Sequence, residues 1–283
     1  MTTHVIVTGT GTPLATHDRA GAGALIRYGD THMQFDAGRG TVARLLGAES
    51  SPALLTALFL THYHSDHVVG LQDLVLSHWT MDVYDEADEL PIYAPNGPTI
   101  DFCESMLDIW ETDLAVRSLH NMRAPEPKID IRGFDAPQVP TEVWSSGDVR
   151  VLANEVRHEP IVNAVGYRVE TPDGVIAISG DTTVCNEVAA LCHGADVVIY
   201  EAMRMDVIAR RPKDKQYIME YHSDTRLIGK QMAELDVPKL MLTHLIPAPH
   251  TPEDEQLFID DVREGGYEGE IMVCRDLDTA VLP

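Results

Sequence analysis

The segment THYHSDH at residues 61–67 places four side chains of metal-ligand type within six positions, His62, His64, Asp66 and His67. His62 and His64 alternate along the chain, so an extended backbone would direct both to the same side. Asp66 and His67 follow after the chain turns, and they can reach a second point close to the first. A lone buried histidine is usually a hydrogen-bonded core residue. This density instead favours a site for two metal ions.

Further residues of ligand type stand where strand-like apolar runs end. In layered α/β folds such ends converge at one edge, where loops build the active site on a rigid scaffold. Imidazoles and carboxylates brought together there suit zinc, manganese or iron, whereas a thiolate site would show cysteine at these positions. The runs and the residues at their ends are ALFLT with His62, VLANEVR with His158, VIAISG with Asp181, VIYE with Glu201, and KLMLT with His244.

The apolar runs alternate with helix-like segments over 40–46, 70–79, 99–119, 186–192 and 224–235. Mixed strands and helices predict a layered α/β protein. The runs VGYRVE and GVIAIS are joined by TPDG, and Asp-Gly favours a tight hairpin turn, so part of the sheet is expected to be antiparallel. The chain shows no composition shift or linker. We therefore predict a single domain over residues 1–283.

The chain is strongly acidic, with 45 Asp and Glu against 21 Lys and Arg and a formal net charge of -24. Nucleic-acid binders usually carry a basic face, so nucleic acid is expected to be an unlikely partner. No apolar run approaches the roughly 20 residues that span a bilayer, and the N-terminus lacks a signal-peptide pattern. A cytoplasmic protein with no membrane partner is the expectation.

The segment THYHSDH resembles the HxHxDH signature of the metallo-β-lactamase superfamily. The later matches follow in the expected order, with His158 in VRHEP, Asp181 in SGDTT and His244 in LTHLI. The likeness runs from the glycine turn GTGTP at 9–13 and from FDAGRG at 35–40 to the last strand. It implies a four-layer αββα sandwich with the site at one edge.

The resemblance also implies a ligand set for two divalent ions, with Zn²⁺ favoured over Mn²⁺ or Fe²⁺. His62, His64 and His158 would hold the first ion. Asp181 would bridge the two ions. The second ion would be held by Asp66, His67 and His244.

Two further segments, YEAMR at 200–204 and YHSDT at 221–225, resemble motifs of ribonuclease Z and of related arylsulfatases and phosphodiesterases. The resemblance implies that His222 protonates the leaving group and that Glu201 orients it. Both motifs are imperfect, because Asp224 replaces Thr and Tyr200 replaces His. The alternative for His222 is a surface histidine at a helix start.

Bacterial ribonucleases Z generally carry a protruding basic arm between the ligands that match His158 and Asp181, and here that gap holds only a compact hairpin. Arg39 also stands where ribonucleases Z usually have Glu, as in the arylsulfatase-like members. We therefore expect a dinuclear hydrolase of small anionic esters, either phosphodiesters or aryl sulfates. Water would be the nucleophile, positioned by Asp66, with His222 as the acid.

Other interpretations remain open at this stage. A lactonase or other carboxylic-ester hydrolase would use the same metals, and a ribonuclease Z-type tRNA 3′-endonuclease would use the same acid. A binding protein with a decayed site is disfavoured by the complete ligand set. A homodimer is possible because relatives are often dimers. The five cations between 204 and 215 form either a positive entrance to the site or a solvated loop: Arg204, Arg210, Arg211, Lys213 and Lys215.

Overall fold

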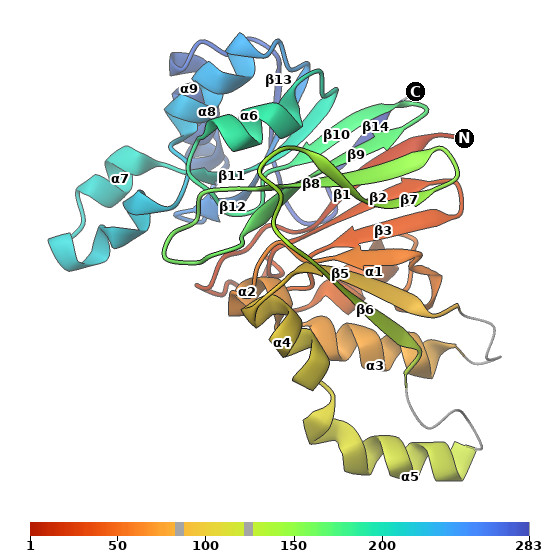
Figure 1. The fold of residues 1–283 in the computed structure, drawn as a ribbon. Coiled ribbons are helices and arrows are strands. Elements are labelled where there is room, and N and C mark those ends of the chain that lie inside the picture. The colour runs from red at the N-terminus through yellow and green to blue at the C-terminus, as the bar shows by residue number, and fades with distance from the viewer. Residues whose placement is uncertain (83–87, 122–126, 283) are drawn as a thin grey trace.

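The structure, a computed structural model, describes residues 1–82, 88–121 and 127–282. Within these residues two seven-stranded mixed sheets lie face to face (Figure 1). The first sheet has the order β14 (Thr279–Leu282), β1 (Thr3–Gly9), β2 (Gly23–Tyr28), β3 (Thr31–Phe35), β4 (Ala57–Phe59), β5 (Leu90–Pro95) and β6 (Ile129–Phe134). The second has the order β13 (Glu270–Val273), β12 (Lys239–Ile246), β11 (Val197–Met203), β10 (Gly174–Ile178), β9 (Val165–Thr171), β8 (Val149–Glu155) and β7 (Thr141–Ser146).

Helices cover the outer face of each sheet, as Figure 1 shows. Helices α1 (Thr41–Gly47), α3 (Leu71–Met81) and α4 (Pro98–Ser105) pack on the first sheet, next to the short η1 (Pro52–Leu54). Helices α6 (Asn186–Cys192), α8 (Thr225–Glu234) and α9 (Pro252–Glu264) pack on the second. The predicted four-layer αββα sandwich is confirmed.

Strand β1 shows why the apolar runs are continuous rather than alternating. Val5 and Val7 face the core between the sheets, while Ile6 packs beneath the helices of the first sheet. Successive side chains of a strand point to opposite faces, so a strand in an inner layer must be apolar on both. The two sheets also meet through a hydrogen bond of 2.6 Å that the Tyr167 hydroxyl donates to the Leu60 carbonyl.

The predicted hairpin over 165–178 is confirmed. Strands β9 and β10 pair antiparallel, with Thr171 opposite Gly174 across the turn. The helix expected over 99–119 is wrong in its extent, because the chain forms α4, the short η2 (Asp108–Trp110) and then a separate α5 (Glu111–Asn121). Only α4 packs on the sheet, whereas α5 projects with Val116 and Leu119 exposed (Figure 1).

A second projection follows β11. It consists of α7 (Met205–Ala209), η3 (Lys213–Lys215) and η4 (Tyr217–Glu220), and it extends away from both sheets (Figure 1). A small apolar cluster of Met203, Ile208 and Ile246 attaches it to the ends of β11 and β12. In the described parts of the chain no helix is long and apolar enough to cross a membrane.

Candidate metal centre

The segment after β4 delivers four of the predicted ligands. His62 lies beyond the strand end, and the short helix α2 (Ser65–Val68) begins directly after His64. The ring nitrogens Nε2 of His62 and Nδ1 of His64 lie 3.0 Å apart, so both histidines face the same point. Asp66 and His67 sit in the first turn of α2 and are buried. The turn therefore separates two pairs of ligand-type side chains, as the sequence predicted.

The sequence predicted His244 at the end of its strand, but the structure places it inside β12. Glu201 pairs with Thr243 and the next residue of β11 pairs with Leu245, so His244 is the extra residue of a bulge, with φ of 45°. A bulge redirects one side chain without ending the pairing of the strands. Glu201 likewise lies within β11 rather than at its end. The bulge turns His244 towards the site, where its Nε2 lies 3.1 Å from Asp66 Oδ2.

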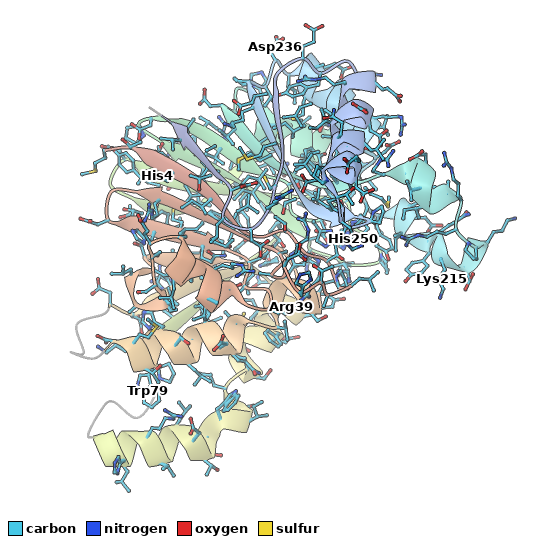
Figure 2. The ribbon with its side chains drawn as sticks, turned by 180° about the vertical axis from the view of Figure 1, so that it is seen from behind. His4, Arg39, Trp79, Lys215, Asp236 and His250 are labelled. Atoms are coloured by element: carbon cyan, nitrogen blue, oxygen red, sulfur yellow. The ribbon has the colours of Figure 1, made fainter. Side chains whose placement is uncertain are left out.

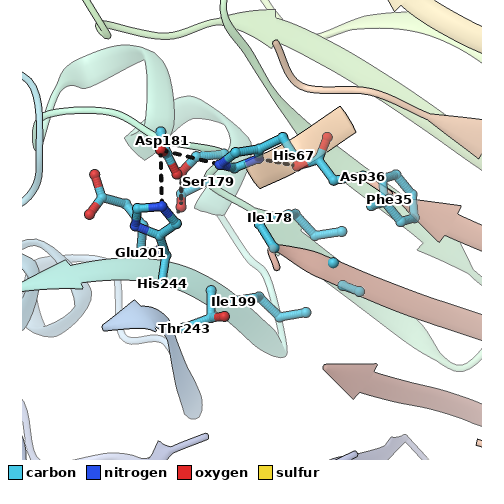
Figure 3. Close-up of a pocket in the computed structure, with 14 residues that line it drawn as sticks. Phe35, Asp36, His67, Ile178, Ser179, Asp181, Ile199, Glu201, Thr243 and His244 are labelled. Atoms are coloured by element: carbon cyan, nitrogen blue, oxygen red, sulfur yellow. Dashed lines mark hydrogen bonds and ion pairs between the residues drawn. The ribbon is translucent and has the colours of Figure 1, made fainter. Parts of the chain in front are cut away.

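Asp181 stands at the centre of the cluster. One of its oxygens, Oδ2, lies 3.3 Å from His67 Nε2 and 3.4 Å from His244 Nε2 (Figure 3). The same oxygen lies 3.8 Å from His158 Nε2 and 3.9 Å from His62 Nε2. A single carboxylate oxygen faces histidines of both predicted ion sites, which is the position that a bridging ligand needs.

The loop that carries Asp181 depends on the preceding glycine. Gly180 has φ of +62°, and a Cβ atom added there would lie 2.7 Å from the Val165 carbonyl oxygen. Only glycine enters this region without a steric penalty. The glycine in SGDTT is therefore part of the architecture of the site.

All seven predicted ligands come together in the structure. Their ligand atoms lie within 4.8 Å of one another in each of two adjoining groups, which are His62, His64, His158 and Asp181, and Asp66, His67 and His244. His222 joins Asp181 and His244 in a third such group. The cluster can bind metal ions, and its oxygen and imidazole donors suit divalent transition metals.

The hydrogen bonds of the histidines fit this role. His67 donates through Nδ1 to Asp36 Oδ2 at 2.7 Å, which leaves its buried Nε2 facing Asp181 Oδ2. His158 donates through Nδ1 to the Tyr221 carbonyl at 3.0 Å, which leaves its Nε2 lone pair facing Asp181. Histidines that bind metals usually donate their other ring N–H to a carboxylate or a carbonyl in this way.

Burial and charge set the protonation of the cluster. Burial lowers the pKa of His62 well below its ordinary value, and burial also lowers the pKa of His158. Burial would raise the pKa of Asp181, but the charges of His244 and His67 hold it well below the ordinary value. Burial lowers the pKa of His67, yet Asp181 and Asp36 raise it well above 6.5. The low pKa values of His62 and His158 keep these rings neutral, as metal binding requires, whereas His67 would have to release a proton when a cation binds.

Sequence reasoning missed Asp36, which follows β3. Its carboxylate accepts hydrogen bonds from the Thr61 backbone N–H at 2.8 Å, from the Thr61 hydroxyl and from His67. Asp36 therefore fixes the ring of His67 without reaching the cluster centre itself. Its only signal in the sequence was its place in FDAGRG, between a buried strand and a glycine.

Glu201 and His222 form a buried pair next to the ligand groups. His222 Nδ1 lies 2.9 Å from Glu201 Oε1, which also accepts from the backbone N–H groups of Thr182 and Ser223. Burial lowers the pKa of His222, but the charge of Glu201 and the hydrogen bond to it raise this pKa to about 9. The alternative of a surface histidine is wrong, since His222 is 7% exposed.

A cleft of about 780 Å³ opens onto the cluster. His64, Asp66, Asp181, His222 and His244 line its floor. Its walls come from three segments of the chain, with Pro13, Leu14 and Thr16 on one side, Pro247, Ala248 and His250 on another, and Arg211, Lys215, Tyr217, Ile218 and Tyr221 from the projection after β11. The basic segment 204–215 therefore borders the site through Arg211 and Lys215. His250 also lines the cleft, although no sequence pattern assigned it a role.

The profile of the Beta-lactamase superfamily domain matches residues 31–245, which contain every residue of the cluster. The chain belongs to the metallo-β-lactamase superfamily. It is a metal-dependent hydrolase of that superfamily. The identity of its metal and its cytoplasmic location stay predictions.

Relatives within this superfamily share most of the chain. Ribonuclease Z of Mycolicibacterium paratuberculosis is 32% identical over 277 residues, which are 96% of both chains. Among solved structures, the metallo-β-lactamase fold protein YhfI from Bacillus subtilis superposes with a TM-score of 0.75 at 17% identity, covering 99% of this chain and 100% of that one. The short form of human tRNase Z gives 0.72 at 20% identity, covering 99% of each.

The expectation of a small-molecule ester as partner, with nucleic acid unlikely, is contradicted by the relatives named Ribonuclease Z. The missing arm between His158 and Asp181 does not separate this chain from them, because the alignment with the Mycolicibacterium paratuberculosis relative covers 96% of both chains. The net charge of -24 misled because it averages the whole surface. Arg211 and Lys215 line the cleft, so the local charge at the site differs from that average.

Proposed function

We propose that the protein is a ribonuclease Z-type phosphodiesterase that cleaves precursor tRNA. The observation that carries the proposal is the Glu201–His222 pair, joined at 2.9 Å and placed beside both ligand groups. A lactonase of the same fold would use the same metals but need not use a leaving-group acid. The 32% identity to a relative named Ribonuclease Z supports the same choice.

In this proposal two divalent ions, zinc first among the candidates, are held by the two groups. His62, His64 and His158 would hold one ion, and Asp66, His67 and His244 would hold the other. Asp181 would be a ligand to both. Such ions lower the pKa of water and neutralise charge on phosphate oxygens. Asp66 accepts a proton from the attacking water and keeps that water aligned with the phosphorus.

His222 gives its proton to the oxygen that leaves the phosphorus. Its Nδ1 is bound to Glu201, so Nε2 is the nitrogen that meets the substrate. Glu201 has its own two backbone donors and therefore holds the ring in place. General acid catalysis of this kind contributes about 10²–10⁴ in rate.

The test is cleavage of a precursor tRNA with a 3′ trailer by protein loaded with Zn²⁺ or Mn²⁺. We expect one cut that releases the trailer, and no cut after chelation or by an Asp181→Asn variant. A mature tRNA, which has no 3′ trailer, serves as the control for general nuclease activity. Protein that carries two ions per chain and leaves the precursor intact would refute the proposal.

A further inference from the structure

The projection after β11 forms one wall of the cleft. We call residues 205–221 the arm. It holds α7, η3 and η4, and it reaches beyond the two sheets (Figure 1). Figure 2 shows Lys215 on this projecting part, on the side of the molecule where His250 also lies. The arm thus brings side chains to the cleft that no sheet or packed helix could supply.

Charge is distributed unevenly along the arm. Arg210, which follows the last residue of α7, forms an ion pair of 3.2 Å with Asp206 inside that helix. Arg211 lines the cleft, and among the described residues no acid lies within ion-pair distance of it. Lys215 has an acidic neighbour, Asp214, at 3.6 Å, and both side chains are largely exposed. Arg211 and Lys215 are therefore available to bind phosphate in a chain that is otherwise strongly acidic.

Two tyrosines of the arm, Tyr217 and Tyr221, line the cleft together with these cations and His222. The ring centroids of Tyr217 and Tyr221 lie 6.2 Å apart, and Tyr217 is 56% exposed. The Tyr221 ring lies 4.9 Å from the ring of His222 and 5.2 Å from that of His158. An exposed aromatic ring that lines the same cleft as basic side chains offers a face on which a nucleobase can stack.

From this arrangement we infer that the arm binds an unpaired segment of the RNA substrate. The base of one nucleotide stacks on Tyr217 and Tyr221, and Arg211 and Lys215 bind the phosphates next to it. Because His222 protonates the leaving oxygen and its ring adjoins Tyr221, the stacked nucleotide is the one that keeps that oxygen. This inference rests on the proposed function. It adds which nucleotide of the substrate is bound and which side chains of the arm bind it.

Stacking of one base on an aromatic side chain changes binding by about 5- to 100-fold when the side chain is truncated. Each phosphate that a cation binds on a single strand contributes about 0.7 to the slope of log affinity against log salt. Both effects are measurable on the intact protein.

The first test pairs a change in the protein with a change in the RNA. Two precursor tRNAs are compared, one complete and one with an abasic residue in place of the nucleotide that keeps the leaving oxygen. Wild-type protein should have a kcat/KM about 5- to 100-fold higher for the complete substrate. Tyr217→Ala should lose that preference, and Tyr217→Phe should retain it.

The second test follows kcat/KM against salt concentration. Arg211→Gln and Lys215→Gln should each reduce the slope by about 0.7. Lys230→Gln in α8 is the matched control, because Lys230 is as exposed as Lys215 and lies outside the cleft. Its slope should equal that of wild type.

The outcomes separate the arm from the proposed function. A wild-type protein that cleaves both RNAs equally, or a Tyr217→Ala variant that loses the same factor on both, would overturn the inference while leaving the ribonuclease in place. Equal salt slopes in all three cation variants would do so as well. A wild-type protein that binds two ions and cleaves neither RNA would instead reject the proposed function.

Discussion

At the scale of single residues, His222 is held so that one ring nitrogen remains for a substrate. Glu201 occupies Nδ1 at 2.9 Å, and the ring stacks beside His244 with centroids 5.3 Å apart. A histidine so placed either donates a proton or completes a metal shell. The two roles differ in what happens to the metal when the ring is removed.

We predict that His222→Ala keeps its metal content and loses about 10²–10⁴ in kcat for RNA. The loss should be much smaller for a nucleotide 4-nitrophenyl ester, because nitrophenolate leaves without a proton. Kinetics on both substrates and elemental analysis check this. His193→Ala, an exposed histidine outside the cleft, is the control. Equal losses on both substrates, or the loss of an ion, would assign His222 another role.

Asp36 acts one step away from the cluster, through the ring of His67. Asp36→Asn replaces one carboxylate oxygen by a donor, so either Thr61 or His67 loses its acceptor. We expect affinity for the ion held by His67 to fall about 10- to 100-fold, measured by competition with a chelating dye. Asp130→Asn, which changes an exposed carboxylate paired with Arg132, should bind metal as wild type does. Unchanged affinity in Asp36→Asn would make Asp36 a purely structural residue.

The sequence revealed the ligands far better than it revealed their supports. His62, His64, Asp66 and His67 could be found because they are consecutive and of one chemical kind. Asp36 is a single acid after a strand, and only tertiary contact with His67 gives it meaning. Tyr217 could not be found for the same reason, since an isolated tyrosine in a loop carries no periodicity.

At the scale of elements, α2 is held by close backbone packing. A Cβ atom added to Gly38 would lie 2.3 Å from the Asp66 carbonyl oxygen and 2.4 Å from the Gly21 carbonyl carbon. Both are backbone atoms, which cannot move aside as a side chain can. Glycine at 38 therefore lets the loop after β3 lie directly against the helix that carries Asp66 and His67.

We predict that Gly38→Ala displaces α2, lowers the free energy of unfolding by about 1–3 kcal/mol and reduces metal content. Denaturant unfolding and elemental analysis measure the two effects. Gly47→Ala is a suitable control, because the added Cβ would meet only the movable side chain of Leu277. A Gly38→Ala protein with full metal content would show that the helix tolerates the shift.

Element types were more predictable than their interruptions. The apolar runs and the hairpin at 165–178 follow from local residue preference. The bulge at His244 does not, because it depends on the register between β11 and β12. The break between α4 and α5 also escaped, since apolar residues continue past Leu107 although the packed cluster beneath the first sheet ends there.

At the scale of the whole molecule, the ligands come from both sheets. His62 and His67 follow the first sheet, whereas His158, Asp181 and His244 belong to the second or to its loops. Ions held between them would tie the two halves together. Anything that binds only the folded state adds RT ln(1 + [L]/Kd) to stability, about 2.7 kcal/mol for each ion at one hundred times its Kd.

We therefore predict two ions per chain by elemental analysis and a clear fall in Tm when they are removed by chelation. Restoring Zn²⁺ or Mn²⁺ should restore the Tm, whereas Mg²⁺ should restore less because imidazole ligands suit it poorly. One ion per chain, or a Tm that chelation leaves unchanged, would contradict a centre shared between the sheets.

The hydrogen bond from His158 Nδ1 to the Tyr221 carbonyl, 3.0 Å long, joins the arm directly to a residue of the ligand cluster. A coupling free energy between RNA binding at the arm and metal binding at His158 would be reciprocal, because linkage between two binding equilibria is reciprocal. If RNA bound to the arm raises the affinity of the cluster for the ion by some factor, the bound ion must raise the affinity of the arm for RNA by the same factor. Metal and RNA would then bind with positive cooperativity, so each would raise the occupancy of the other's site.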